Sequence, residues 1–499
     1  GVAAAIVAAG GKVADFNKRA PKAAAPKGVE KVTTDVLVVG GGAGGLAAAV
    51  RAATQGAHVI LIEKRPNIGG ATQLNAGTLV ATGSRYQREV MKETKDSPEL
   101  LAKDIFRAGE NKNDPVLVKM VGEKAGGVVD WLIYDLKIPY GPAATQYPDH
   151  SANRQLGVTG RSVNWLKLMS QKLNENGGKI MTDTRAQEFI RDKAGNVVGV
   201  KATMTNGQKI DFSAKSVVLA SGGYGANRAM LPKKVASYLF YGLDSETGDG
   251  LAMGKKIGAG TINLDLVKQY PQGVETLPHH ALAATASSTD TMKKSGAIYV
   301  NRDGKRIVDE LAGLGTLTKI TEAQKDSIMY IVMDKAAWKQ YVAKSLEDKL
   351  VAAPSDLDKW AKIVNNGYPV MATSAKLADA AKTMGINAKG LQATIARWNG
   401  FVKAGADKDF GRKVLMPFGE GPYYIVEQKP RFQTTLGGLK ANADMQILNK
   451  KGQPIGNLFG AGCVVGGANG SDSLTAMMNS WAIISGVVAG DSAVKNLKK

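Results

Sequence analysis

Cysteine is almost absent from this chain of 499 residues, which contains only Cys463. A single thiol excludes an internal disulfide, an iron–sulfur cluster held by the chain's own cysteines, and covalent haem attachment through C-x-x-C-H. Histidine is also scarce, with four in all. The adjacent pair His279 and His280 fits a loop better than a ligand pair, so a zinc site is not expected. If haem or a cluster delivers electrons to this chain, another polypeptide has to carry it.

Long apolar runs are missing too. Residues 1–11 are small and apolar but too short to span a bilayer. They are similar to the hydrophobic end of a secretory signal without its basic start, and the Ala-, Pro- and Lys-rich segment that follows is typical of a flexible lead-in. The alternatives are a tag remnant or a short packed helix. We therefore expect residues 1–32 to be a residual signal and linker, and the protein to be exported, for example to the periplasm.

Acidic residues are in the minority, because 65 Lys and Arg face 44 Asp and Glu and leave a net charge of +21. Such a charge favours anionic partners, either acidic redox proteins or carboxylate substrates. The lysines are scattered and no DNA- or RNA-binding motif is present, which argues against nucleic acid. The chain is also too long for one ordinary core, so two or three structural units are expected.

The most informative stretch runs from residue 35 to residue 64. An apolar run ends in Gly40, Gly42 and Gly45, which fit the G-x-G-x-x-G fingerprint; a small-residue helix and a second apolar run follow, and that run ends at Glu63. The glycines permit a sharp turn and close approach to a pyrophosphate at a helix N-terminus, and the acid can accept from ribose hydroxyls. Strand, turn, helix, strand and acid in register predict a dinucleotide site.

Two further segments end apolar strands in glycines, at residues 216–224 and 457–462, and the glycine-rich residues 247–250 precede a predicted helix. They return to the first unit from both sides of residues 269–430, where the composition changes to lysine-rich helices and a predicted β-hairpin near 296–306. We therefore predict an α/β protein: a Rossmann-like FAD-binding domain, residues 33–268 and 431–499, with an inserted α+β capping (substrate) domain at 269–430. FAD suits this arrangement better than NAD.

These segments resemble the fumarate reductase/succinate dehydrogenase flavoprotein superfamily, and within it the soluble flavocytochrome c type reductases of fumarate, urocanate and acrylate type. The resemblance covers residues 33–495 and rests on the order and spacing of DVLVVGGGAGGLAAA (35–49), IEKRPNIGG (62–70), VVLASGGYGAN (217–227), TGDG (247–250), GAIYVNRDGKRIVDE (296–310), TLGGL (435–439) and LFGAGCVVGG (458–467).

The resemblance implies bound FAD and hydride transfer between flavin N5 and a substrate carbon. Together with the glycine pattern, it gives the expected FAD-binding residues: Gly40, Gly42, Ala43, Gly45, Glu63, Lys64, Gly69, Gly70, Ala71, Thr72, Asn75, Gly77, Ser221, Gly222, Gly223, Asp249, Gly462, Cys463, Ser473 and Leu474.

The chain departs from the family where the family binds dicarboxylates. Tyr270 stands in place of a substrate-binding histidine, as in the urocanate-type relatives, and Gln433-Thr434 replace a histidine pair. The family's proton-donating arginine falls at about Leu314, and its carboxylate-binding arginine at about Ser473. Neither side chain can grip a carboxylate in the bidentate way of arginine. The sequence thus argues against fumarate or succinate as substrate.

Catalysis still requires a titratable group that delivers a proton beside the carbon receiving hydride. Tyr270 is the first candidate, followed by Lys293 and Asp290, which precede the predicted hairpin where the family keeps its proton path. The alternatives are a core tyrosine and solvated surface charges. Arg306 and Glu310 are expected to brace the hairpin through an ion pair.

We therefore predict an FAD-dependent reductase of an activated C=C bond in an enoate or enone that is not a small dicarboxylate, with electrons supplied by a cytochrome c or another carrier. Two alternatives stay open at this point: a flavin dehydrogenase of a bulky, ketosteroid-like compound, and a non-catalytic flavin electron-transfer subunit.

Overall fold

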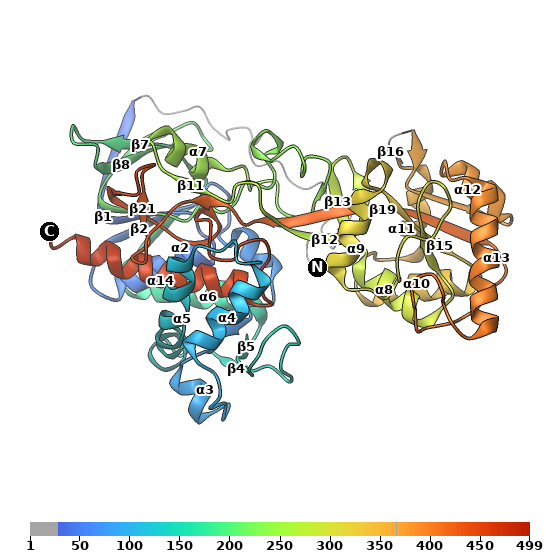
Figure 1. The fold of residues 1–499 in the computed structure, drawn as a ribbon. Helices are drawn as coiled ribbons and strands as arrows, with labels where there is room; N and C mark the ends of the chain where they lie inside the picture. Colours follow the sequence, from blue (N-terminus) through green and yellow to red (C-terminus); the bar gives the residue numbers. More distant parts are fainter. Residues whose placement is uncertain (1–27, 366) are drawn as a thin grey trace. The chain divides into compact units, whose positions relative to one another are not determined.

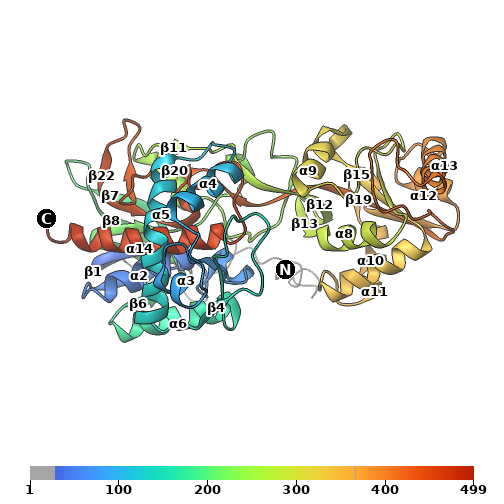
Figure 2. The same ribbon diagram turned by 60° about the horizontal axis from the view of Figure 1, so that its bottom comes forward.

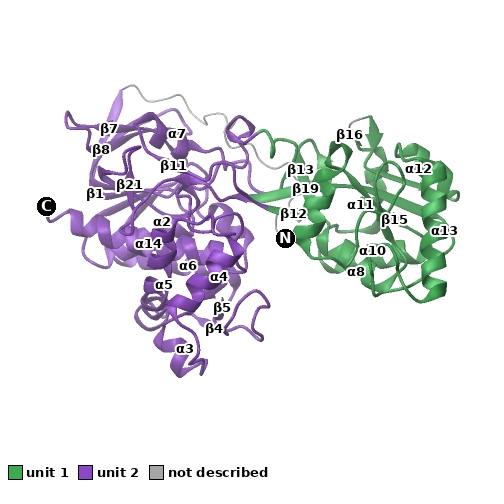
Figure 3. Cartoon of the chain, in the orientation of Figure 1, with its two compact units in different colours: residues 1–14, 233–241, 269–433 green, residues 15–232, 242–268, 434–499 purple. Residues whose placement is uncertain are grey.

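The structure is a computed structural model that describes residues 28–365 and 367–499. These residues form two compact units, drawn in different colours in Figure 3. We call residues 28–232, 242–268 and 434–499 the N-terminal unit, and residues 233–241 and 269–433 the inserted unit.

The N-terminal unit is built on a sheet whose five central strands run parallel in the order β22-β9-β1-β2-β6. The apolar run Val36–Val39 of β1 is buried, as a strand covered on both faces requires. Antiparallel β21, β7 and β8 complete the sheet. The strands are β1 Val29–Val39, β2 Val59–Ile62, β6 Lys179–Met181, β7 Thr184–Arg191, β8 Val197–Met204, β9 Lys209–Leu219, β21 Gln446–Leu448 and β22 Pro454–Gly460.

Two helices from opposite ends of the chain, α2 and α14, pack against each other beside this sheet (Figures 1 and 2). The contact is close, because a Cβ on Gly486 would lie 2.4 Å from the carbonyl oxygen of Gly44. The helices of the unit are α2 Ala43–Ala53, η2 Gly70–Leu74, α3 Arg85–Glu89, α4 Pro98–Ala108, α5 Pro115–Asp130, η3 Trp131–Asp135, α6 Arg161–Glu175, η4 Arg228–Met230, α7 Asp249–Lys256, η7 Gly462–Val464 and α14 Met477–Asn496, and its smaller strands are β3 Leu79–Val80, β4 Tyr140–Pro142, β5 Gln155–Val158, β11 Thr261–Ile262 and β20 Gly438–Leu439.

The inserted unit has its own seven-stranded sheet, in the order β10-β13-β12-β19-β15-β14 with β18 paired to β19. Side chains of β15 alternate between two cores: Ile331 packs with residues of α8 and α10, and Val332 with residues of α12 and α13. Helices therefore cover both faces. The elements are β10 Leu239–Phe240, β12 Val267–Leu277, β13 His280–Ala283, α8 Thr285–Lys294, β14 Ile298–Val300, α9 Leu314–Ala323, η5 Lys325–Ser327, β15 Met329–Met333, α10 Lys335–Glu347, α11 Pro354–Asp358, η6 Lys359–Lys362, β16 Val364–Asn365, β17 Tyr368–Pro369, β18 Met371–Ser374, α12 Leu377–Thr383, α13 Ala388–Ala404 and β19 Tyr423–Thr435.

The predicted fold class is confirmed, with corrections at the boundaries. Strand β1 begins at Val29, inside the predicted linker, because its outer half pairs with β9. Residues 233–241 belong to the inserted unit, since Leu239 and Phe240 pair with β19. The predicted signal remnant at residues 1–11 lies outside the described residues. Within residues 28–365 and 367–499, no helix combines the length and the apolarity needed to cross a membrane.

The hairpin predicted near residues 296–306 is wrong as a paired unit. Strand β14 pairs with β15, about thirty residues further along the chain, and only the Val300–Arg306 bridge closes the local turn. The expected ion pair is present, with Arg306 donating to Glu310 at 2.7 and 3.0 Å and also to Asp407. Long-range pairing replaced the local one because β15 offers a full buried ladder.

A buried charge network holds the region around β5 and α4. The guanidinium of Arg154, fully buried, lies 2.8 Å from Asp96 and 2.6 Å from Asp104. Burial alone would raise the pKa of Asp104, but hydrogen bonds from Ser151 and Arg154 outweigh it and hold the pKa far below its ordinary value. Both carboxylates therefore stay ionised, and Arg154 is the buried cation that they share.

Replacing Arg154 by Met is expected to lower the free energy of unfolding by about 3–5 kcal/mol at pH 7, because it leaves two buried carboxylates without their cation. Folded-state stabilisation from a lowered carboxyl pKa is present above about pH 4 and is lost as pH falls. The deficit of the variant should therefore shrink on acidification. Denaturant unfolding compared at pH 7 and at several values below pH 4 measures this.

The matched control is Arg107→Gln, because Arg107 also pairs with Asp104 but its side chain is 53% exposed. This variant should lower the free energy of unfolding by less than about 1 kcal/mol. If Arg154→Met lowers the free energy of unfolding no more than this control does, the buried charge network does not stabilise the fold as expected.

Candidate cofactor site

The predicted glycine turn joins β1 to α2 in the conformation that its sequence requires. Gly40 has φ of +112°, and a Cβ there would lie 2.1 Å from the carbonyl oxygen of Ala220 at the end of β9. A Cβ on Gly45 would lie 1.8 Å from the oxygen of Gly40. No side chain fits at either place, so the backbone of the turn and the N-terminus of α2 are held open toward a neighbouring groove.

That groove, with a volume of about 100 Å³, lies wholly within the N-terminal unit. Four strand or helix ends meet in it: the β1–α2 turn, the end of β2, the end of β9 and the end of β22. Its lining residues are Gly40, Gly41, Gly42, Ala43, Gly44, Glu63, Lys64, Arg65, Gly70, Ala71, Thr72, Ala220, Ser221, Gly222, Ser245, Glu246, Ala461, Gly462, Cys463 and Ala482. Twelve of the predicted FAD-binding residues are among them.

Glu63 is buried at the end of β2, and its carboxylate is partly engaged. Oε1 accepts from the N–H of Gly41 at 3.0 Å, and Oε2 accepts from the N–H of Arg65 at 2.8 Å. A carboxylate has about four lone-pair positions, so two remain for outside donors such as ribose hydroxyls. Glu63 therefore holds the glycine turn to the second strand and keeps the capacity to bind a ligand.

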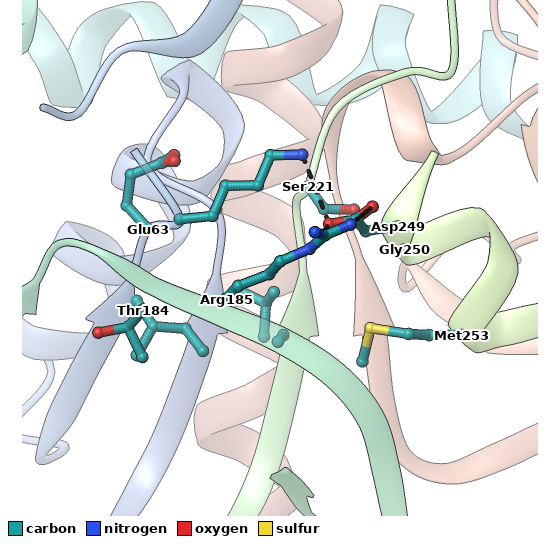
Figure 4. Close-up of a pocket in the computed structure, with 12 residues that line it drawn as sticks. Glu63, Thr184, Arg185, Ser221, Asp249, Gly250 and Met253 are labelled. Atoms are coloured by element: carbon teal, nitrogen blue, oxygen red, sulfur yellow. Dashed lines mark hydrogen bonds and ion pairs between the residues drawn. The ribbon is translucent and has the colours of Figure 1, made fainter. Parts of the chain in front are cut away.

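A smaller cavity of about 40 Å³ adjoins the groove at Gly40, Glu63 and Ser221 (Figure 4). Here Asp249, at the start of α7, receives two hydrogen bonds of 2.9 Å from Arg185 and lies 3.4 Å from Lys64. Burial lowers the pKa of Lys64, although Asp249 opposes this. Ser221 contributes a buried hydroxyl without a partner.

Two functional residues that sequence reasoning missed are Glu246 and Arg65. Burial raises the pKa of Glu246 to about 7, against the lowering effect of Lys64 and Arg65. Burial also lowers the pKa of Arg65. Arg65 stands directly after the recognised Glu63-Lys64 pair and could have been found by extending it, but nothing in the sequence around Glu246 marks it as a groove residue.

Several predicted cofactor residues support the groove without lining it. Gly69 has φ of +124° and donates to the oxygen of Gly41. The side-chain oxygen of Asn75 accepts from the N–H of Gly77 and from Ser162. A Cβ on Gly223 would lie 2.3 Å from the hydroxyl of Thr435.

Ser473 and Leu474 are buried just before α14, and the carbonyl oxygen of Ser473 accepts from Lys268 at 2.9 Å. Cys463 lines the groove, and burial raises the pKa of its thiol to about 12. A thiol that remains protonated is a poor nucleophile, so the environment of Cys463 suits packing rather than redox chemistry.

The three predicted catalytic residues all lie in the inserted unit. The guanidinium of Arg431 lies over the ring of Tyr270, on β12. The central carbon of the guanidinium is 4.5 Å from the ring centroid. Asp290, on α8, pairs with Lys294 at 3.0 Å and accepts from Gln340, while Lys293 is exposed. Burial would raise the pKa of Asp290, but these partners lower it. A carboxyl held ionised is a poor proton donor, which argues against Asp290 in that role.

The residues of the groove fit FAD. The glycine turn has no side chains that would keep a diphosphate from the start of α2, Glu63 retains acceptor capacity for a ribose, and Ser221 brings a buried hydroxyl without a partner. The ends of β9 and β22 and helix α14 enclose the other end of the groove, where a flavin ring requires close backbone approach.

Comparison with known proteins agrees with this geometry. Residues 35–477 match the family described as FAD binding domain. The chain is 33% identical to urocanate reductase of Eggerthella lenta, over 99% of this chain and 80% of that protein. It is 31% identical to a fumarate reductase (cytochrome) of Shewanella frigidimarina, over 94% of this chain and 78% of that protein.

The open conformation of a flavocytochrome c3 fumarate reductase superposes with a TM-score of 0.76 at 27% identity, covering 94% of this chain and 79% of that one. With a matching family model over most of its length and relatives above 30% identity, the chain belongs to the FAD binding domain family within the fumarate reductase/succinate dehydrogenase flavoprotein superfamily, and is an FAD-dependent oxidoreductase.

Proposed function

We propose that this protein reduces an activated C=C bond in an enoate or enone that is not a small dicarboxylate. The observation that carries the proposal is the glycine-lined groove ending at Glu63, in a chain whose similar proteins reduce urocanate and fumarate. FAD, when bound, supplies the hydride for such a reaction. The protein's own task is then to hold the cofactor, orient the substrate and deliver a proton.

Cofactor binding is assigned to the groove residues. Backbone N–H groups of the β1–α2 turn bind the diphosphate, and Glu63 accepts from the adenosine ribose. The adjoining cavity is lined by the cations Lys64 and Arg185 and by the carboxylates Asp249 and Glu63, so its charges balance.

The exclusion of small dicarboxylates rests on two positions. Leu314 begins α9 with 40% of its surface exposed, and Ser473 is buried with a hydroxyl that has no partner. An alkyl chain and a single hydroxyl cannot replace two bidentate guanidinium contacts. A second carboxylate on the substrate would lack a cation at these positions.

Electrons are proposed to come from a separate carrier such as a cytochrome c, because the single cysteine of this sequence cannot form a C-x-x-C-H haem attachment site. The net charge of +21 would attract an acidic carrier and speed its association. Export to the periplasm accords with such a partner and with the apolar character of residues 1–11.

The reaction is tested anaerobically, with the flavin reduced by a viologen and then mixed with enones, monocarboxylic enoates, aryl acrylates and fumarate. At least one of the first three classes should reoxidise the flavin, and fumarate should be slower by about tenfold or more, since it loses charge-assisted bonds. Stopped-flow absorbance measures the rates. Reoxidation by none of them would refute the reductase, and fumarate as the best acceptor would refute the exclusion of dicarboxylates.

Glu63→Gln should raise the dissociation constant for FAD about 10- to 100-fold, because a charge-assisted hydrogen bond becomes a neutral one. The control is Glu188→Gln on β7, whose carboxylate is 41% exposed and pairs with Lys256. FAD retained after dialysis, measured by absorbance, distinguishes the two. Equal retention in both variants would remove Glu63 from the ribose-binding role.

Tyr270→Phe should lower the rate of substrate reduction about 100-fold with little change in KM, if Tyr270 donates the proton. Tyr424→Phe is the matched control, since Tyr424 is half-buried in the same unit as Tyr270 but stacks on Trp338 instead of facing Arg431. Stopped-flow traces at saturating acceptor give the comparison. A Tyr270→Phe enzyme as fast as wild type would rule out this proton donor.

A further inference from the structure

Arg431 on β19 is a buried cation of the inserted unit that has no counter-ion within residues 28–365 and 367–499. Its residue surface is 6% exposed, and its single side-chain hydrogen bond runs from Nη2 to the hydroxyl of Thr285 at 3.0 Å. Its Nε is buried without a partner. Burying a guanidinium in this state is costly, because the lost hydration is not replaced.

Three other buried arginines, Arg154, Arg306 and Arg412, have acids or several carbonyl oxygens as partners, although the Nε of Arg412 is also buried without one. Arg154 binds two aspartates, and Arg306 binds Glu310 and Asp407. Arg412 donates to three carbonyl oxygens of the α8–β14 connection. Arg431, in contrast, has the neutral hydroxyl of Thr285 as its side-chain hydrogen-bond partner. Within the described part of the chain, its charge is therefore not compensated by an acid.

Two tyrosine rings hold the Arg431 guanidinium in place. Its central carbon lies 4.5 Å from the ring centroid of Tyr270 and 5.1 Å from that of Tyr241. These contacts are made with the π faces of the two rings. They leave the N–H groups in the plane of the guanidinium available for hydrogen bonds. Gly273 makes room for the arginine, because a Cβ there would lie 3.1 Å from the Cβ of Arg431.

The position of the cluster in the inserted unit suits a ligand site. Tyr241 ends one segment of the unit, Tyr270 is the second residue of the next, and Arg431 is the third from the end of that segment. All three therefore lie where the chain enters or leaves the inserted unit. Strand β19 itself continues to Thr435, whose hydroxyl accepts from the N–H of Tyr224.

We propose that Arg431 binds the carboxylate of the substrate, with the hydroxyl of Thr285 positioning its guanidinium and the rings of Tyr241 and Tyr270 flanking the bound group. This inference rests on the proposed function and narrows it from enoates or enones to monocarboxylic 2-enoates. A planar guanidinium edge matches a carboxylate in a bidentate way, which explains how such an acid could bind although Leu314 and Ser473 replace two arginines.

The test is binding to the oxidised holoenzyme, which requires no turnover. The probes are 3-phenylpropionate and propionate, each compared with its neutral amide, by calorimetry. Wild type should bind at least one acid about 10- to 100-fold more tightly than its amide, and Arg431→Gln should abolish this preference. Arg431→Lys should retain part of it, because a single charge remains.

Arg397→Gln is the control, because Arg397 lies in the same unit but is 62% exposed and paired with Asp409. It should keep the preference of wild type. Arg431→Gln should not lower the Tm, since it removes an uncompensated charge, whereas a structural arginine would lower it. Equal binding of acid and amide by wild type, or an unchanged preference in Arg431→Gln, would overturn the inference.

The same variants separate this inference from the reductase proposal. Cinnamate should reoxidise the viologen-reduced flavin faster than methyl cinnamate in wild type, with the difference lost in Arg431→Gln. Reoxidation by enones and esters but no preference for acids overturns the role of Arg431 alone. Acid binding that depends on Arg431, without any reoxidation, overturns the reductase alone.

Discussion

The close approach of α2 to β1 is the constraint on which the N-terminal unit depends. A Cβ on Gly45 would lie only 1.8 Å from the carbonyl oxygen of Gly40, so no side chain fits at this position in the first turn of α2. Helix α14 adds a second close contact, because Gly490 meets Ala48 in the same way that Gly486 meets Gly44. The groove therefore exists because both ends of the chain supply glycine at the same place, and its backbone polar groups are exposed for that reason.

This local constraint explains why the cofactor site was the most predictable part of the protein. The turn, α2 and Glu63 lie within about thirty residues, and their spacing alone specifies strand, turn, helix and acid. Glu246 and the pairing of β14 with β15 depend on residues far apart in sequence, and no local pattern marks them. Residues 233–241 were assigned to the wrong unit for the same reason, since their only strong ties are to β13 and β19.

Buried charge is handled in two ways in this protein. In the core, each arginine is matched by acids or carbonyl oxygens, as Arg154 and Arg412 are. Arg431 departs from this rule, and such departures are expected where a protein reserves interactions for a ligand. Sequence reasoning could not find it, because the arginine became noticeable only when Tyr241, Thr285 and Tyr270 were seen to surround it.

Substrate specificity in this chain can then be understood as a change in where positive charge is placed. The family positions at Leu314 and Ser473 have lost their cations, so a substrate with two carboxylates leaves one of them unpaired, and an unpaired charge costs more than a missing contact. A single buried guanidinium supplies one bidentate site and no more. The site that we propose would accommodate one carboxylate, and it would favour a monocarboxylic acid both by attraction at Arg431 and by the lack of a cation at Leu314 and Ser473.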